Sequence, residues 1–285
     1  MSEKKLAIKL STLEGIGNAV REKEGSTDLI PVNALADRIG ALQIASGENK
    51  LIPFIEGTST EITAEDLEGA TKVREYAFYN MSSLEVITLP DTITVIGQYA
   101  FSGSSQTRIN KIANLVLPNS VIRIDDYVCS SCVYLQNITF SQNAQFTIIP
   151  SNSFNTCNIL DNVVIPNNVL EIGNSAFSYC VKLANITLSN NLTKIGSQAF
   201  RNCAKLTQLT LPASLTSIGA NALRCGAAAS EVTFTFLGTT PPTIDSNTFY
   251  TLTLNKIIVP AGSGEAYKSA TNWANFADYI EEAAV

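Results

Sequence analysis

The most reactive side chains in this sequence are cysteines, and their spacing indicates a structural column. Four lie three residues after a recurring Phe position, one lies two residues after it and one replaces the Phe. In chain order they are Cys129, Cys132, Cys157, Cys180, Cys203 and Cys225. Free Cys behaves as a small buried hydrophobe, so we expect one stacked column of reduced thiols. Disulfides between neighbouring repeats are an alternative, because stacked Cα atoms lie within bridging distance.

The other groups that could support catalysis are sparse. The chain has no histidine, which excludes Ser-His-Asp and Cys-His catalysis and His-rich metal sites. The adjacent carboxylates Asp125 and Asp126 lie where a turn uses Asp for local hydrogen bonds. The Cys129-Ser-Ser-Cys132 spacing suits a redox motif, but these cysteines occupy ordinary repeat positions. We therefore expect no enzyme, with no catalytic residue, no cofactor and no metal.

Single glycines follow a repeated Ile in several copies of the repeat. They are Gly97, Gly173, Gly196 and Gly219. This placement does not form a Gly-rich phosphate loop, and it predicts turns that need the backbone freedom of glycine.

The bulk composition bounds the class of protein. The 285 residues are 45% hydrophobic and 15% charged, with a net charge of −6, which favours a folded, core-rich chain. No basic face for phosphates is evident, so we expect no nucleic-acid partner. Polar residues interrupt positions 1–20, which argues against a signal peptide, and no run is long enough for membrane insertion. We expect a protein that is cytoplasmic when made.

A repeated sequence determines the predicted architecture. Phe177 and Phe200 are 23 residues apart, the length of one coil of a solenoid. An apolar residue precedes the Phe position by five residues in eight pairs: Val73/Phe78, Ile96/Phe101, Ile124/Cys129, Ile149/Phe154, Ile172/Phe177, Ile195/Phe200, Ile218/Leu223 and Ile244/Phe249. A strand follows in each coil, with residues such as Ile186 and Leu188 facing inward. We expect a repeat solenoid with short parallel strands.

This repeat, with its Leu-x-x-Ile-x-Leu-Pro continuation, resembles the BspA-type leucine-rich repeats of bacteria from about Ile62 to Pro260. The resemblance implies a leucine-rich-repeat solenoid over 49–285 and a C-terminal helical cap at 258–285. Two coils are longer than the others, at 102–111 and 238–242, and such insertions often lie beside the binding face. The family resemblance also implies an adhesin.

Residues 1–48 predict a separate all-α module of two amphipathic helices. The segment from Leu13 to Ile39 resembles a short N-terminal module of phage and prophage tail-associated proteins of Gram-positive bacteria. The matching core is Ile16-x-x-Ala-Val-Arg21-x-Lys23-x-Gly25-Ser-Thr. The resemblance implies attachment to a larger assembly, and two short helices bury little surface alone, so we expect 1–48 to form homo-oligomers.

The outward strand positions form two predicted ladders along the solenoid. The first contains Val86, Asn114, Asn137, Asn162, Asn185, Gln208 and Glu231, and the second contains Thr88, Val116, Thr139, Val164, Thr187, Thr210 and Thr233. One interpretation is structural, with stacked amides bonding along the sheet. The other is a binding face of amides and hydroxyls, with these candidate residues: Asn114, Asn137, Thr139, Asn162, Asn185, Thr187, Gln208 and Thr210.

These observations favour a non-enzymatic binding protein whose partner is a protein or glycan on a cell surface. The leading hypothesis is a phage or prophage recognition protein, virion-associated through residues 1–48. The alternative is a bacterial cell-surface or secreted adhesin, exported by a route that the sequence does not show. A fold alone does not identify the ligand.

Overall fold

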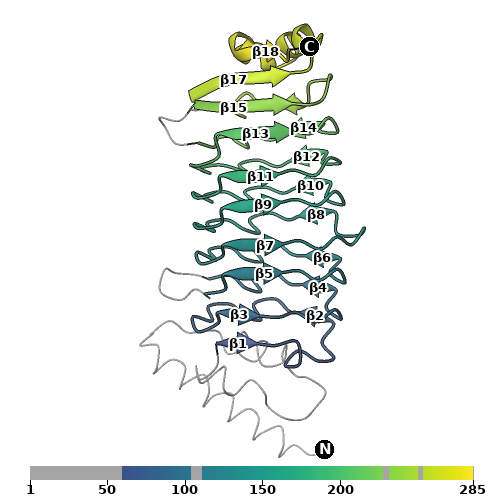
Figure 1. The fold of residues 1–285 in the computed structure, drawn as a ribbon, viewed down its shortest axis with the longest axis vertical. Coiled ribbons are helices and arrows are strands. Elements are labelled where there is room, and N and C mark those ends of the chain that lie inside the picture. The colour runs from purple at the N-terminus through teal and green to yellow at the C-terminus, as the bar shows by residue number, and fades with distance from the viewer. Residues whose placement is uncertain (1–59, 104–110, 227–230, 250–252, 285) are drawn as a thin grey trace, which may run out of the picture.

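The protein is an elongated solenoid, seen in a computed structural model that describes residues 60–103, 111–226, 231–249 and 253–284 (Figure 1). The predicted helices of 1–48 and most of the predicted insertion at 102–111 lie outside these ranges. The coils stack along one long axis, and the C-terminus lies at one end of the stack. This confirms the predicted repeat solenoid for the described part of the chain.

Each coil contributes one strand to a first face and one shorter strand to a second face, and all paired strands are parallel. The first-face strands are β1 (Glu61–Ile62), β3 (Val86–Ile87), β5 (Asn114–Val116), β7 (Asn137–Thr139), β9 (Asn162–Val164), β11 (Asn185–Thr187), β13 (Gln208–Leu211), β15 (Glu231–Phe236) and β17 (Thr253–Val259). The second-face strands are β2 (Lys72–Val73), β4 (Val95–Ile96), β6 (Arg123–Ile124), β8 (Ile148–Ile149), β10 (Glu171–Ile172), β12 (Lys194–Ile195), β14 (Ser217–Ile218) and β16 (Thr243–Ile244).

A tight turn closes each coil on its third side and links it to the next coil. In one example the N–H groups of Tyr127, Cys129 and Ser131 donate to carbonyls of the following coil at 3.0, 2.8 and 2.7 Å. Tyr127 and Ser131 hold φ of 60° and 61°, which turns these N–H groups in one direction. Such positive φ values cost energy for residues other than glycine, and the hydrogen bonds between coils offset that cost.

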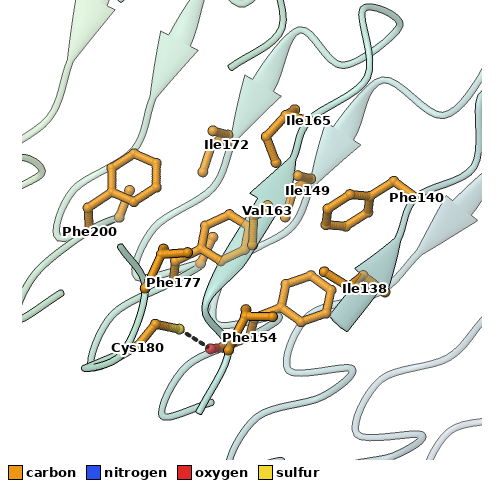
Figure 2. Packing of buried hydrophobic residues seen from close by; sticks show 14 of the residues in the cluster. Ile138, Phe140, Ile149, Phe154, Val163, Ile165, Ile172, Phe177, Cys180 and Phe200 are labelled. Atoms are coloured by element: carbon orange, nitrogen blue, oxygen red, sulfur yellow. Dashed lines mark hydrogen bonds between the residues drawn. The ribbon is translucent and has the colours of Figure 1, made fainter. Parts of the chain in front are cut away.

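The repeated apolar positions form one continuous core. Phe177 stacks on Phe154 and Phe200 with ring centroids 5.5 and 5.8 Å apart, and all three side chains are fully buried (Figure 2). Burying such a ring contributes roughly 1.5–3 kcal/mol. The predicted inward strand residues are buried as expected, except that Ile186 is only partly covered. The core therefore follows the sequence pattern closely.

One coil departs from the Phe stack and compensates within itself. Cys129 replaces the repeated Phe, and the strand position that holds Leu or Ile in neighbouring coils is Phe140. The Phe140 ring packs edge-on against Phe154, with centroids 5.5 Å apart. The aromatic volume lost at one position is thus regained at another, which keeps the interior filled.

The first-face register differs from the prediction at β15. Gln208 pairs with Thr233 and Thr210 with Thr235, so Glu231 and Thr233 are not their counterparts as predicted. The residues of β15 alternate polar and apolar over six positions, with Val232, Phe234 and Phe236 buried. A shift of two residues keeps every side chain on the same face, so alternation alone could not distinguish the two registers.

The glycines that follow the repeated Ile serve close packing rather than a special backbone conformation. Gly97, Gly173, Gly196 and Gly219 are absent from the positive-φ glycines of the described chain. A Cβ on Gly196 would lie 2.7 Å from the backbone carbonyl carbon of Gly173 in the preceding coil. The predicted reason, backbone freedom, is therefore wrong, and the requirement is space between stacked coils.

The C-terminal end carries the short helices α4 (Gly264–Ser269) and η1 (Trp273–Tyr279) where a helical cap is predicted, and it adds the strand β18 (Ile280–Glu282). β18 pairs in parallel with β17. Trp273 and Tyr267 are fully buried against Phe236. The cap therefore covers both the last sheet edge and the end of the core, which an uncapped solenoid would expose.

We predict that Gly196→Ala lowers the free energy of unfolding by about 1–3 kcal/mol, because the added methyl group must push two coils apart. Chemical denaturation followed by circular dichroism measures the change. Asp125→Ala is the matched control, because Asp125 occupies the same coil position and already has a Cβ. The control loses only the ion pair of Asp125 with Arg123, worth about 0–1 kcal/mol. Equal stability of Gly196→Ala and the wild type would contradict the packing argument.

Candidate functional site

The predicted binding face lies on the first-face strands, and its side chains point outward as expected. All eight candidate residues, on β5 to β13, are exposed. The amide column runs beside the hydroxyl column, because outward residues on one strand are two positions apart. The face therefore presents amide and hydroxyl groups side by side along the solenoid axis.

The amides of this face pair with each other in twos. Asn137 Nδ2 donates to Asn114 Oδ1 at 2.8 Å, and Asn185 Nδ2 donates to Asn162 Oδ1 at 2.8 Å. Among the described residues no amide bond joins one pair to the next or reaches Gln208. The structural interpretation is confirmed for the two pairs. Each pair still presents a carbonyl oxygen and N–H donors to an incoming ligand.

Some neighbouring strands of the first face are not hydrogen-bonded to each other, and we call each such place a joint. The amide pairs lie on strands that are paired, between these joints. β5 pairs with β7, β9 with β11, and β13 with β15, whereas β7 does not pair with β9, nor β11 with β13. A hollow of about 690 Å³ lies at the β11–β13 joint. Another of about 650 Å³ includes the β7–β9 joint and extends to Lys182, Ala184 and Lys205 of the following coils. The surface is thus indented where neighbouring coils lack sheet hydrogen bonds.

Most of the predicted site residues line these hollows. Asn185, Thr187, Gln208 and Thr210 line the larger hollow, and Asn137 and Asn162 line the smaller one. Asn114 and Thr139 do not belong to either lining. The structure therefore divides the predicted ladder into two adjacent concave sites that meet at Ala184 and Lys205.

Sequence reasoning missed the charged residues at the edge of these hollows. Lys182, Lys205 and Asp161 line the smaller hollow, and Lys205 also lines the larger one. All three are exposed. The sequence contained a signal for the two lysines, because each directly precedes a repeated Leu, at Leu183 and Leu206, and so occupies the same position in its coil. These charges extend the site beyond the amide and hydroxyl columns.

The carboxylates Asp125 and Asp126 take structural roles in a turn. The guanidinium Nε of Arg123 lies 3.0 Å from Asp125 Oδ1. The backbone N–H of Ser151 donates to Asp126 Oδ1 at 2.9 Å. The Asp126 bond joins two neighbouring coils and the Asp125 contact is an ion pair between side chains, so neither is the local backbone bond that the sequence predicts for Asp in a turn.

The predicted insertion at 238–242 accepts hydrogen bonds from the C-terminal cap. Tyr267 Oη donates to the Gly238 carbonyl at 2.8 Å, and Trp273 Nε1 donates to the Pro242 carbonyl at 2.8 Å. Buried Trp and Tyr need such acceptors for their polar atoms. The extra residues of this coil therefore supply hydrogen-bond acceptors to the cap.

The six cysteines form the predicted buried column, and all are free thiols. The Sγ atom of Cys180 donates to the Phe154 carbonyl of the preceding coil at 3.1 Å (Figure 2). Burial raises the pKa of Cys180 to about 12 and that of Cys225 to about 12. Burial, followed by contact with Cys132, also raises the pKa of Cys129. Because the thiolate is the nucleophile, these thiols are poorly suited to catalysis.

Over 60–103, 111–226, 231–249 and 253–284, no three His, Cys, Asp or Glu side chains come together as a metal-binding group. Within those same ranges, every helix is too short or too polar to cross a membrane.

This fold and this site define a leucine-rich-repeat solenoid with a polar, indented sheet face. The model of the BspA type leucine rich repeat region matches in six copies over residues 57–159, 108–224 and 147–272. These matches span more than half of the chain, so the protein belongs to the BspA-type leucine-rich-repeat family. Membership is consistent with a binding or adhesion role. Among curated proteins, none matches this sequence.

One solved structure shows the same fold, and two others have lower similarity. A leucine-rich repeat protein from Bacteroides ovatus is similar with a TM-score of 0.53 and 22% identity, over 70% of this chain and 55% of that one. A leucine rich cell surface protein from Faecalibacterium prausnitzii gives 0.43 and 22%, over 79% and 67% of the two chains. The T. pallidum leucine rich repeat protein gives 0.40 and 22%, over 64% and 75%. The chain thus spans about half the length of the Bacteroides ovatus protein.

We predict that the native protein reacts very slowly with a thiol-specific disulfide reagent at pH 8, because all six thiols are buried. For Cys180 and Cys225 a pKa of about 12 also leaves almost no thiolate at this pH. In guanidinium chloride without reductant, all six cysteines should react rapidly. Absorbance of the released chromophore follows both reactions. Rapid labelling of the native protein, or fewer reactive thiols after denaturation, would contradict the free buried column.

Proposed function

We propose that this protein is a non-enzymatic recognition protein that binds a protein or glycan on a cell surface through its first face. The observation that carries the proposal is the coincidence of the amide and hydroxyl columns with two concave joints of the sheet. Concave surfaces with a few converging polar groups are the usual sites of ligand binding.

The chemistry of this face suits a ligand rich in hydroxyl or amide groups. Thr187, Gln208 and Thr210 are exposed in one hollow, where they offer both donors and acceptors. Lys182, Lys205 and Asp161 add charges of both signs at the edge. Charges in such positions mainly set orientation and association rate, while the buried polar contacts determine specificity.

The reactive groups of the described chain support binding more than catalysis. The linings of the two hollows hold one carboxylate, Asp161, and no cysteine, and the chain has no histidine. General acid–base chemistry requires a proton donor and acceptor within hydrogen-bond reach of one substrate atom. Hydrogen-bond recognition requires only the amides and hydroxyls that are present.

We predict that the double variant Thr187→Ala/Gln208→Ala weakens ligand binding about tenfold, since two hydrogen bonds contribute about 0.5–1.5 kcal/mol each. Both side chains line one hollow. The full chain is first applied to glycan and protein arrays, and the affinity for the selected ligand is then measured by titration calorimetry. Asn275→Ala, an exposed change in η1, is the control. Equal affinities of the wild type and the double variant would refute the assignment of this face.

The resemblance of residues 1–48 to phage tail-associated modules supports a finer proposal, that the protein is carried on a phage or prophage particle. Residues 1–48 would then attach or oligomerise the chain and leave the solenoid free to contact the host. The alternative proposal is a bacterial surface or secreted adhesin, which the leucine-rich-repeat family supports.

The two locations predict different results in one experiment. Electron microscopy with a labelled antibody should find the protein on particles released after prophage induction, because attached copies remain with the virion. Fractionation of uninduced cells is the control. Label on the cell envelope with none on the particles would refute the virion proposal and favour the adhesin.

A further inference from the structure

The second face contains one interruption, at the β6–β8 joint. The described second-face strands form a row β2-β4-β6 and a row β8-β10-β12-β14-β16, without pairing between β6 and β8 (Figure 1). Cys129 and Phe154 are 25 residues apart, compared with 23 for Phe177 and Phe200. The two extra residues lie in the turn 141–145, which its own bonds hold, such as Gln145 N–H to Asn143 Oδ1 at 2.9 Å.

Proline at the end of β8 explains why the two rows do not join. In neighbouring coils the residue after the strand donates its N–H to the preceding coil: Gly173 to Ile149 at 2.7 Å, Gly196 to Ile172 at 2.7 Å and Asp125 to Ile96 at 2.9 Å. The same position after β8 is Pro150. Proline has no N–H, so the Ile124 carbonyl cannot receive the equivalent bond.

The joint therefore exposes two strand edges to each other. In the regular coil Glu171 N–H donates to the Thr147 carbonyl at 3.2 Å, whereas the corresponding Ile148 N–H and Ile122 carbonyl form no backbone bond across the β6–β8 joint. Unpaired strand edges are templates for an added strand. The joint opens into a cleft of about 670 Å³, lined by Ile122, Ile124 and Ile148 among others.

The charged groups at this cleft are mainly acidic. Glu75, Asp125 and Asp126 line it together with one cation, Arg123. Arg123 pairs with Asp125 at 3.0 Å, so the charges of Glu75 and Asp126 are left uncompensated by that cation. Gln98 and Gln145 add amides to the same lining. An incoming segment with a lysine or arginine matches this charge.

We propose that the cleft between β6 and β8 binds an extended, lysine- or arginine-containing peptide segment of a partner protein, which pairs as an added strand. The vacant backbone carbonyls and N–H match the alternating groups of a peptide. Aromatic side chains, which commonly stack on sugar rings, do not line the cleft. This binding site lies on a different face from the amide and hydroxyl columns, so the two bind independently.

The test is to select from a displayed random heptapeptide library on the full chain. Selected peptides should be rich in lysine or arginine and in strand-forming residues. Synthetic copies should lose about tenfold or more in affinity for Glu75→Gln/Asp126→Asn, measured by fluorescence anisotropy. Asp278→Asn, a charge change at an exposed residue of η1 outside both proposed sites, is the matched control and should bind as the wild type does. Backbone N-methylation of the peptide should abolish binding, because it removes the strand donors.

A second variant tests the vacant edge itself. Pro150→Ala restores the missing N–H, which lets β8 pair with β6 and narrows the cleft, so peptide binding should fall while the melting temperature is kept or raised. No selected peptide, selection of acidic peptides, or equal binding by the wild type and both variants would overturn the proposal. Failure here leaves the glycan and protein array result on the first face unaffected, so the two proposals are distinguishable.

Discussion

Close stacking of coils at the strand spacing is the constraint on which the structure depends. Neighbouring strands lie about 4.7–4.9 Å apart, so every inward side chain must pack on its counterpart one coil away. Phe154, Phe177 and Phe200 satisfy this by parallel ring stacking, and Gly196 satisfies it by leaving out a Cβ that would meet backbone at 2.7 Å. The core residues are therefore needed for packing between coils. A binding site must use outward side chains or the joints where strands of neighbouring coils are not paired.

Both proposed binding sites lie where strands of neighbouring coils are not hydrogen-bonded to each other. The hollows of the first face lie at the β7–β9 and β11–β13 joints, and the cleft of the second face lies at the β6–β8 joint. At each joint the strands keep their outward side chains but lose hydrogen bonds between coils. The core beneath stays continuous, because side-chain packing does not require each sheet bond. A solenoid can thus open polar sites without weakening its interior greatly.

The sequence predicts the repeat, the core and the outward columns because these follow from residue type at fixed spacing. The repeated Ile and Phe positions, such as Ile195 and Phe200, face inward in each coil because their spacing is the same. Pairing between coils is harder to predict, since it depends on small displacements of whole coils. Two signals were nevertheless present: Pro150 has no N–H, and the interval from Cys129 to Phe154 is two residues longer than the standard coil. The β15 register was not decidable, because a two-residue shift preserves its alternation.

Sheet hydrogen bonding between coils is interrupted at the β7–β9, β11–β13 and β6–β8 joints, and residue-resolved amide hydrogen exchange tests this most directly. The amides of Ile148, Asn162 and Gln208 face joints and should exchange quickly. Those of Glu171, Asn185 and Thr233 hold the equivalent positions in paired coils, where they donate to carbonyls at 3.2, 3.3 and 2.9 Å, and should be protected. Equal protection in the two groups would contradict the account, since it would show a continuous sheet across the joints.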